Sequence, residues 1–173
     1  MIIIFKDKHS KVEAATALAN SVLKNPMFYD EIRKKNHFDL STASPSIIAD
    51  LIKQSNLEFI IDLFYPSGWR AFKYRKTLAF TDRRFPNTLF FNMKKLRRSP
   101  KNIAATIIHE CLHFLDNEAI EYTFGHGNNS SKGKQNTAPY WIGNLAHKLL
   151  KDNFEAELLV FDQLEDDEND LLE

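Results

Sequence analysis

The segment from Ser99 to Glu118 constrains the fold most, because it combines strong helix signals with an almost wholly apolar interior. Ser99 followed by Pro100 is a typical helix start, since serine caps free amide groups and proline fits the first helical turn. The residues 103–115 are apolar on nearly every side of such a helix, apart from a few ionisable groups. We therefore predict a long helix over 100–118 that lies in the core of the domain.

The ionisable groups of this segment form the sequence His109-Glu110-Cys111-Leu112-His113. Residues four apart lie on one face of a helix, so both imidazoles aim at one point, and Glu110 reaches the side of that point. This spacing is the HExxH motif, in which the histidines bind zinc and the glutamate acts as general base. A buried helix must pair such groups or give them a metal, and we predict Zn²⁺ as the cofactor. Cys111 points elsewhere and is predicted to fill the core.

A catalytic zinc needs a third protein ligand and one open coordination position. We predict His126 as that ligand, because Gly125 and Gly127 let the backbone turn sharply and approach another element. Asp116 follows His113 so closely on the helix that a place beside the ligands suits it better than direct coordination. The alternatives left open for the third ligand are Glu118, Glu121 and His147.

Tyr140 is the first candidate for a further catalytic group, as a donor to the oxyanion of the reaction. It opens a predicted helix over 139–150, directly after the loop that carries His126. Tyr122 and Lys134 are the alternatives, and a tyrosine that only packs in the core is the competing interpretation of Tyr140.

The motif at 109–113, followed by Gly125-His126-Gly127, resembles the SprT-like and related zincin metallopeptidases. The stretch 124–129, with Thr137-Ala138-Pro139-Tyr140-Trp141-Ile142-Gly143 after it, also resembles small uncharacterised peptidase-like proteins of bacteria and phages. The resemblance covers about 89–143. It implies an α+β, zincin-like domain, in which a small mixed or antiparallel sheet packs on the central HExxH helix and an edge strand runs beside the substrate. It also implies a protein or peptide substrate.

The remaining segments predict the elements around this helix. Ser10 and Glu13 have the spacing of a capping box at the start of a helix, and Ser44-Pro45 opens another helix to about Ser55. Alternation or apolar runs predict strands over 2–5, 57–65, 72–81 and 87–92. We expect Thr88 to Asn92 to be an edge strand that offers hydrogen bonds to an extended peptide.

The chain of 173 residues predicts one domain over 1–164 and an acidic, flexible tail over 165–173. A single cysteine excludes an intramolecular disulfide and favours a reducing compartment. The N-terminus does not resemble a signal peptide, and no apolar run approaches the roughly 18 residues of a membrane span. We expect a cytoplasmic protein with no membrane contact.

Net charge is zero, but the charges are segregated along the chain. Residues 67–101 hold eleven Lys and Arg against one acid, whereas 152–173 hold ten Asp and Glu and no base. The two regions can both face solvent, or the tail can lie over the basic region.

The aromatic residues Trp69, Phe72, Tyr74 and Phe85 are interleaved with these bases, which makes nucleic acid a possible but less favoured partner. The rival functions are therefore a zinc-dependent hydrolase of nucleic acid and a non-catalytic metal-binding module. A metallopeptidase is favoured over both, because the glutamate of the motif is the usual base of that class and a structural zinc is normally closed by four ligands.

Overall fold

A computed structural model of the chain describes residues 1–74, 77–81, 84–125 and 133–151. The elements in chain order are β1 (Ile2–Phe5), α1 (Ser10–Lys24), α2 (Pro26–Lys34), α3 (Pro45–Gln54), β2 (Glu58–Phe64), α4 (Gly68–Lys73), β3 (Ala79–Thr81), β4 (Thr88–Asn92), the 3-10 helix η1 (Met93–Lys95), α5 (Pro100–Glu118) and α6 (Ala138–Leu150). The boundary predicted at 164 and the acidic tail lie outside the described residues.

The described strands form one mixed sheet of four strands in the order β1-β2-β4-β3. β1, β2 and β4 are parallel, and β3 is antiparallel to β4. The predicted α+β fold, with a small mixed sheet on the HExxH helix, is therefore confirmed. The expectation that Thr88 to Asn92 forms an edge is wrong, because β4 pairs with β2 on one side and with β3 on the other.

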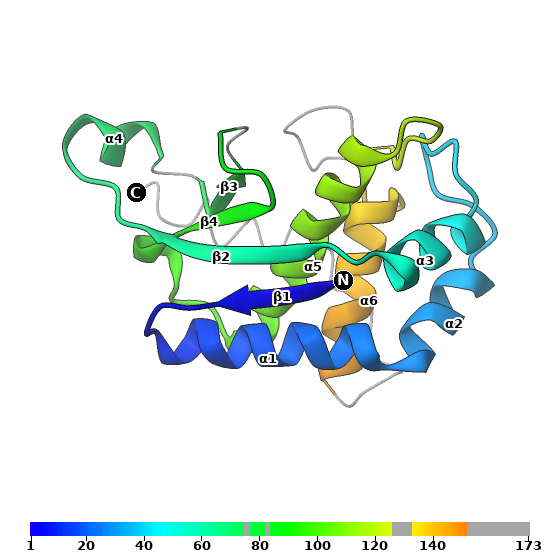
Figure 1. The fold of residues 1–173 in the computed structure, drawn as a ribbon, viewed down its shortest axis with the longest axis horizontal. Coiled ribbons are helices and arrows are strands. Elements are labelled where there is room, and N and C mark those ends of the chain that lie inside the picture. Colours follow the sequence, from blue (N-terminus) through cyan, green and yellow to red (C-terminus); the bar gives the residue numbers. More distant parts are fainter. Residues whose placement is uncertain (75–76, 82–83, 126–132, 152–173) are drawn as a thin grey trace.

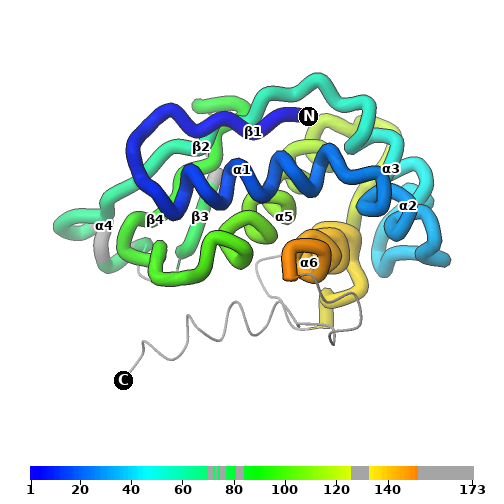
Figure 2. Tube along the Cα trace, turned by 90° about the horizontal axis from the view of Figure 1, so that it is seen from below, coloured from blue at the N-terminus to red at the C-terminus, as the bar shows by residue number. Residues whose placement is uncertain are grey.

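The molecule is layered from the sheet through α1 and α5 to α6 (Figures 1 and 2). One face of the sheet is buried against the helices and is formed by Ile3, Phe59, Ile61, Leu89 and Phe91. The parallel pair β1 and β2 is connected through α1, α2 and α3, of which α2 and α3 lie together at one end of the molecule (Figure 1). This arrangement leaves α5 covered by the sheet on one side and by α6 on another.

Helix starts were predicted well where a side chain caps the helix. Ser99 Oγ accepts a hydrogen bond from the Asn102 amide at 3.3 Å, and α5 runs over Pro100–Glu118 as predicted. Ser44 Oγ caps α3 in the same way through the Ile47 amide. The capping box at Ser10 is wrong, because the helix already begins there and its first amides bond to the carbonyl of His9.

The strand predicted over 72–81 is also wrong in its first half. Gly68, with φ of +53°, begins the short helix α4, and the rings of Trp69 and Phe72 lie 6.1 Å apart on it. The chain then crosses the end of β4, where the Asn92 side-chain amide donates to the carbonyls of Tyr74 and Thr77. Only Ala79–Thr81 pairs as a strand.

No helix in the described part of the chain is long and apolar enough to cross a membrane.

Candidate metal centre

His109 and His113 meet on one face of α5, as the spacing of the motif predicts. Their Nε2 atoms lie 3.1 Å apart, and the two rings are inclined at 76° to each other. His109 is buried at 6% exposure, whereas His113 is half-buried nearer the end of the helix. The two nitrogens therefore converge at the margin of the core rather than inside it.

This convergence fits a zinc ion. Two nitrogens bound to a tetrahedral zinc at about 2.0–2.1 Å lie about 3.3 Å from each other, close to the separation of His109 Nε2 and His113 Nε2. Either ring can instead donate a hydrogen bond to the other, depending on the tautomers. In the hydrogen-bonded arrangement one of the two Nε2 atoms carries a proton, so both nitrogens can bind a metal only after this proton moves to Nδ1 of the same ring.

Glu110 and Cys111 follow His109 on α5 but face different surroundings. Glu110 is half-buried, one residue and about 100° around the helix from His109. Cys111 points into the core with 3% exposure, and burial together with the negative charge of Glu110 raises the pKa of its thiol. The thiol therefore stays protonated at neutral pH, as expected of a small core side chain.

Tyr140 lies directly beside the histidine pair. It is in the first turn of α6, is buried at 3% exposure, and its ring meets the His109 ring edge-on at 4.6 Å between centroids. α5 and α6 run in opposite directions, with Tyr140 near His109 and His147 near Asn102 (Figure 1). The residue predicted as oxyanion donor is thus in contact with one predicted metal ligand.

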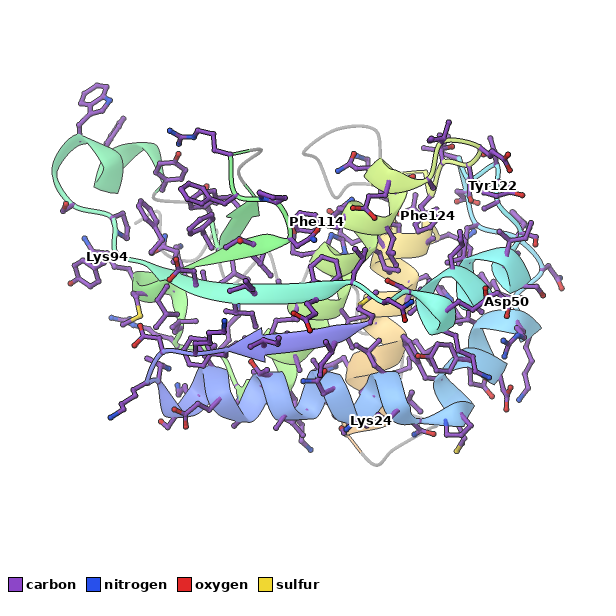
Figure 3. All side chains as sticks on the ribbon, viewed as in Figure 1. Lys24, Asp50, Lys94, Phe114, Tyr122 and Phe124 are labelled. Atoms are coloured by element: carbon purple, nitrogen blue, oxygen red, sulfur yellow. The ribbon has the colours of Figure 1, made fainter. Side chains whose placement is uncertain are left out.

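The segment 122–125 folds back against α5, and contacts of Thr123, Phe124 and Gly125 hold it in place. Asp116, on the same face of α5 as the two histidines, accepts a hydrogen bond from the Phe124 amide at 2.7 Å. Burial raises the pKa of this carboxyl, and the Phe124 amide partly offsets that effect. Phe124 is fully buried at the C-terminal end of α5, whereas Phe114 contacts Phe59 on the sheet side (Figure 3).

The same segment is fixed against the loop between α2 and α3. Thr42 and Thr123 exchange hydrogen bonds, in which the Thr42 amide donates to the Thr123 carbonyl at 3.0 Å and the Thr123 amide donates to Thr42 Oγ1 at 2.9 Å. Gly125 has φ of +90° and lies so close to the backbone of 39–41 that a Cβ would not fit. The glycine thus makes the close backbone approach predicted from the sequence.

Sequence reasoning missed this loop as part of the support of the centre. Asp39 bonds to Asn136 twice, through the Asn136 amide group on Asp39 Oδ1 at 2.7 Å and through the Asp39 amide on the Asn136 carbonyl at 3.1 Å. Phe38 also contacts Trp141 of α6, with ring centroids 5.6 Å apart. Residues on both sides of 126–132 are thus held by the loop between α2 and α3, and only Gly125 indicates such contacts in the sequence.

His126 itself, the predicted third ligand, lies in 126–132, outside the described residues. Within the described part, no three His, Cys, Asp or Glu side chains converge on one metal position. The alternatives are all directed elsewhere. Glu118 lines a cavity of about 440 Å³ on the far side of α5, next to Leu51 and Ser55 of α3 and its C-cap, and Glu121 is exposed.

The third alternative, His147, is also separate from the pair formed by His109 and His113. Its Nε2 lies 2.6 Å from Asn102 Oδ1, about two helical turns before His109 along α5. Burial and the positive charges of Lys151 and Lys101 lower the pKa of His147 to about 4, so the ring is neutral at neutral pH. The neutral ring is part of the contact between α5 and α6.

No protein-family model, curated protein or solved structure matches this chain. The resemblance to zincin peptidases therefore stays a prediction from the motifs.

Proposed function

We propose that the protein is a zinc-dependent metallopeptidase of the zincin class, which hydrolyses protein or peptide substrates in the cytoplasm. The observation that carries the proposal is the 3.1 Å separation of His109 Nε2 and His113 Nε2, with Glu110 on the next position of the same buried helix. The cytoplasmic location rests on the cysteine usage, because a chain with Cys111 as its single cysteine uses no intramolecular disulfide for stability.

In this proposal His109, His113 and His126 hold the metal. His126 is supported by the contacts of Phe124 and Gly125, which fix the chain directly before it to Asp116 and to the 39–41 backbone. When bound, zinc would polarise a scissile carbonyl and lower the pKa of a water molecule towards about 7.

The remaining steps belong to the side chains of the protein. Glu110 accepts a proton from the water that attacks the scissile carbonyl carbon, and the new C–O bond forms as this proton leaves. The Tyr140 hydroxyl donates a hydrogen bond to the oxygen on which negative charge develops. Glu110 then gives the proton to the leaving amine as the C–N bond breaks, which restores the carboxylate.

The ligand set is tested by elemental analysis of purified variants. We expect about one zinc per chain in the parent, loss of zinc in His113→Ala and His126→Ala, and retention in Glu110→Gln. The matched control is His9→Ala, because His9 lies directly before α1, outside the 39–42 loop, and its side chain makes no cap hydrogen bond. A parent chain that takes up no zinc, even when zinc is offered, would show that α5 is only a core helix and would end the proposal.

Glu110 is tested by hydrolysis of an unfolded protein substrate. We expect Glu110→Gln to keep its zinc and to lose about 10²- to 10⁴-fold in rate, as for removal of a general base. Equal rates in the parent and in this variant would contradict the mechanism.

Tyr140 requires a substitution that keeps its packing. Tyr140→Phe retains the ring against His109 and removes only the hydroxyl. We expect unchanged zinc content and a kcat lowered by about 10²-fold or more, as for loss of an oxyanion donor. An unchanged kcat would reduce Tyr140 to a packing residue and leave the rest of the proposal standing.

A further inference from the structure

The outer face of the sheet, opposite to α5, carries a cluster of aromatic rings. Because Phe59 and Ile61 of β2 point inward, Asp62 and Phe64 point outward, and the register places Asp62 beside Phe90 of β4. We call the cluster the aromatic face, and its members are Phe64, Tyr74, Phe80, Phe85 and Phe90. Each ring touches at least one other member, so the cluster is continuous across β2, β4 and β3.

Part of the aromatic face has the geometry of a stack. The rings of Phe80 and Phe90 are nearly parallel, at 17° and 5.2 Å, and Tyr74 stacks on Phe80 at 27° and 5.0 Å. These rings are only half-buried, and Phe85 at the margin is 50% exposed. The other ring contacts are edge-to-face, at 71° to 89°, so the cluster presents ring edges and parts of ring faces on a side of the sheet that no described helix covers. An exposed apolar cluster of this kind is typical of an interaction site.

The neighbouring segment, around α4, exposes three more rings. Trp69 is 81% exposed, Phe72 is 70% exposed, and Tyr65 is 66% exposed. Trp69 and Phe72 face each other across one side of the short helix. They lie at the same end of the molecule as β3 (Figure 1), next to the aromatic face.

Positive charge accompanies the rings. The Arg84 guanidinium lies 5.9 Å from the centre of the Phe85 ring, and the Lys94 ammonium lies 5.4 Å from the centre of the Tyr65 ring. Residues 67–101 hold eleven bases and a single acid. Two acids of β2 are also exposed on the outer face: Glu58 pairs with β1, and Asp62 lies beside Phe90 within the aromatic face.

We propose that the aromatic face, together with Trp69 and Phe72, binds single-stranded nucleic acid. Single strands offer both chemistries that this surface complements, because their phosphates are regularly spaced anions and their unpaired bases are flat. Half-exposed rings on the open face of a four-stranded sheet are a known geometry for stacking bases. A double helix hides the faces of its bases, so duplexes bind more weakly.

This function is separate from the metal centre. The aromatic face lies on the outer side of the sheet, whereas His109 and His113 are on α5, beneath the inner side, and His109 faces α6. Nucleic-acid binding therefore does not depend on zinc or on Glu110, and the peptidase proposal can fail without affecting it.

The test measures the affinity for a labelled oligodeoxythymidine of about 20 nucleotides, and for a duplex of equal length, by fluorescence anisotropy at about 50 and 200 mM NaCl. We expect the full chain to prefer the single strand and to bind it more weakly at higher salt. Trp69→Ala, Phe72→Ala and Phe85→Ala remove exposed rings, so they should fold normally and weaken binding about fivefold or more each. Ile120→Ala is the matched control, because Ile120 is fully exposed outside this surface.

The charge contribution is tested by a second matched pair. Lys94→Gln should weaken binding and lower the slope of log affinity against log salt concentration by about 1. Lys24→Gln, at the C-terminal end of α1, should change neither the affinity nor the slope (Figure 3). Asp62→Asn, next to Phe90, should strengthen binding.

Three results would each overturn the proposal: no binding of the oligonucleotide at about 50 mM salt, parental affinity in all three ring variants, or equal affinity for the duplex. Self-association lost in these variants, without oligonucleotide binding, would instead assign the face to a second copy of the chain. Binding only to anionic phospholipid vesicles would assign it to a lipid surface.

Discussion

At the scale of single residues, the candidate centre depends on a few contacts that hold the segment 122–125 in place. Gly125 shows this most clearly, because its φ of +90° and the nearby backbone leave no room for a side chain. Asp116 supplies the hydrogen bond acceptor for the Phe124 amide. Neither residue is a predicted ligand, yet both hold the last described residues before His126 in place.

Gly125→Ala should destabilise the fold by about 2–4 kcal/mol. An added Cβ would overlap the Asp39 carbonyl oxygen and lie 2.8 Å from the Leu40 carbonyl carbon, in addition to the strain of the positive φ. Gly133→Ala is the control, because Gly133 has φ of +78° with open space around it and should lose only about 1–2 kcal/mol. Urea unfolding measures the loss of unfolding free energy in both variants. Equal losses would show that the close approach of Gly125 to the backbone of 39–41 does not add to the cost of the substitution.

Asp116→Ala should cost about 1–3 kcal/mol in the free energy of unfolding, because the partly buried Phe124 amide loses its acceptor. Asp116→Asn keeps an oxygen in the same place and should cost clearly less. Asp50→Ala serves as the control, since the exposed Asp50–Arg33 ion pair contributes at most about 1 kcal/mol. If the Ala and Asn variants unfolded at the same urea concentration, the hydrogen bond to Phe124 would carry no weight.

At the scale of elements, α5 joins the candidate metal centre to the rest of the fold through three different faces. Phe114 contacts the sheet, Cys111 lies in the core, and His109 and Asn102 face α6. The contact between α5 and α6 therefore includes His147, which is neutral at neutral pH and becomes protonated in acid.

Stability should fall as the pH drops from about 6.5 to about 4. His147 has a pKa near 4 in the folded chain and 6.5 as its ordinary value, so the unfolded chain binds more protons in this window. The stabilisation is complete above pH 6.5, and its loss is worth roughly 3 kcal/mol at most. His147→Gln retains a donor for Asn102 without titrating, so its unfolding free energy should depend less on pH over this range. If the free energy of unfolding of the parent and of His147→Gln fell equally with decreasing pH, groups other than His147 would cause the acid sensitivity.

Sheet pairing sets a second prediction at this scale. The Asn92 amide donates to the Leu78 carbonyl, so the alternation of antiparallel pairs directs the backbone groups of Phe80 to β4 and those of Ala79 and Thr81 to the open edge. Under the peptidase proposal, an extended substrate adds to this edge. Ala79→Pro should then lower kcat/KM for long peptides with little change in stability, whereas Phe80→Pro should disrupt the sheet. Unchanged kcat/KM in Ala79→Pro would place the substrate elsewhere.

The sequence predicted those elements and contacts that depend on local chemistry. The cap at Ser99, the extent of α5 and the convergence of His109 and His113 follow from the next few residues and from helical periodicity. The edge position of β3 and the base under Gly125 depend on contacts between distant segments. Ser41 and Thr123, for example, are hydrogen-bonded across 82 positions of sequence. No local pattern specifies such a pairing, so the loop 39–42 could not be predicted as support for the centre.

At the scale of the whole molecule, the charges divide into two opposing regions. The chain has 23 bases and 23 acids, and residues 152–173 hold ten of the acids, so residues 1–151 carry 23 bases against 13 acids and a net charge of +10. A field of this size attracts anions over distances of about a Debye length, roughly 10 Å at 0.1 M salt. The ten acids of 152–173 have the same sign of charge as a nucleic acid, so under the nucleic-acid proposal we expect this segment to compete with the ligand of the aromatic face.

Neutralising part of the acidic segment should therefore strengthen oligonucleotide binding in the full-length chain. A variant carries Glu165→Gln, Asp166→Asn, Asp167→Asn, Glu168→Gln and Asp170→Asn. We expect its affinity for oligodeoxythymidine to rise about 3- to 10-fold at 50 mM salt and to approach the parental value near 500 mM, because salt screens the competing charges. Five neutral substitutions in the acids Glu13, Asp30, Glu31, Asp50 and Glu121, which lie outside the aromatic face, change the net charge equally and are the control. If both variants gained the same affinity, the effect would come from net charge alone, whereas a larger gain in the first would locate the competition in the acidic segment.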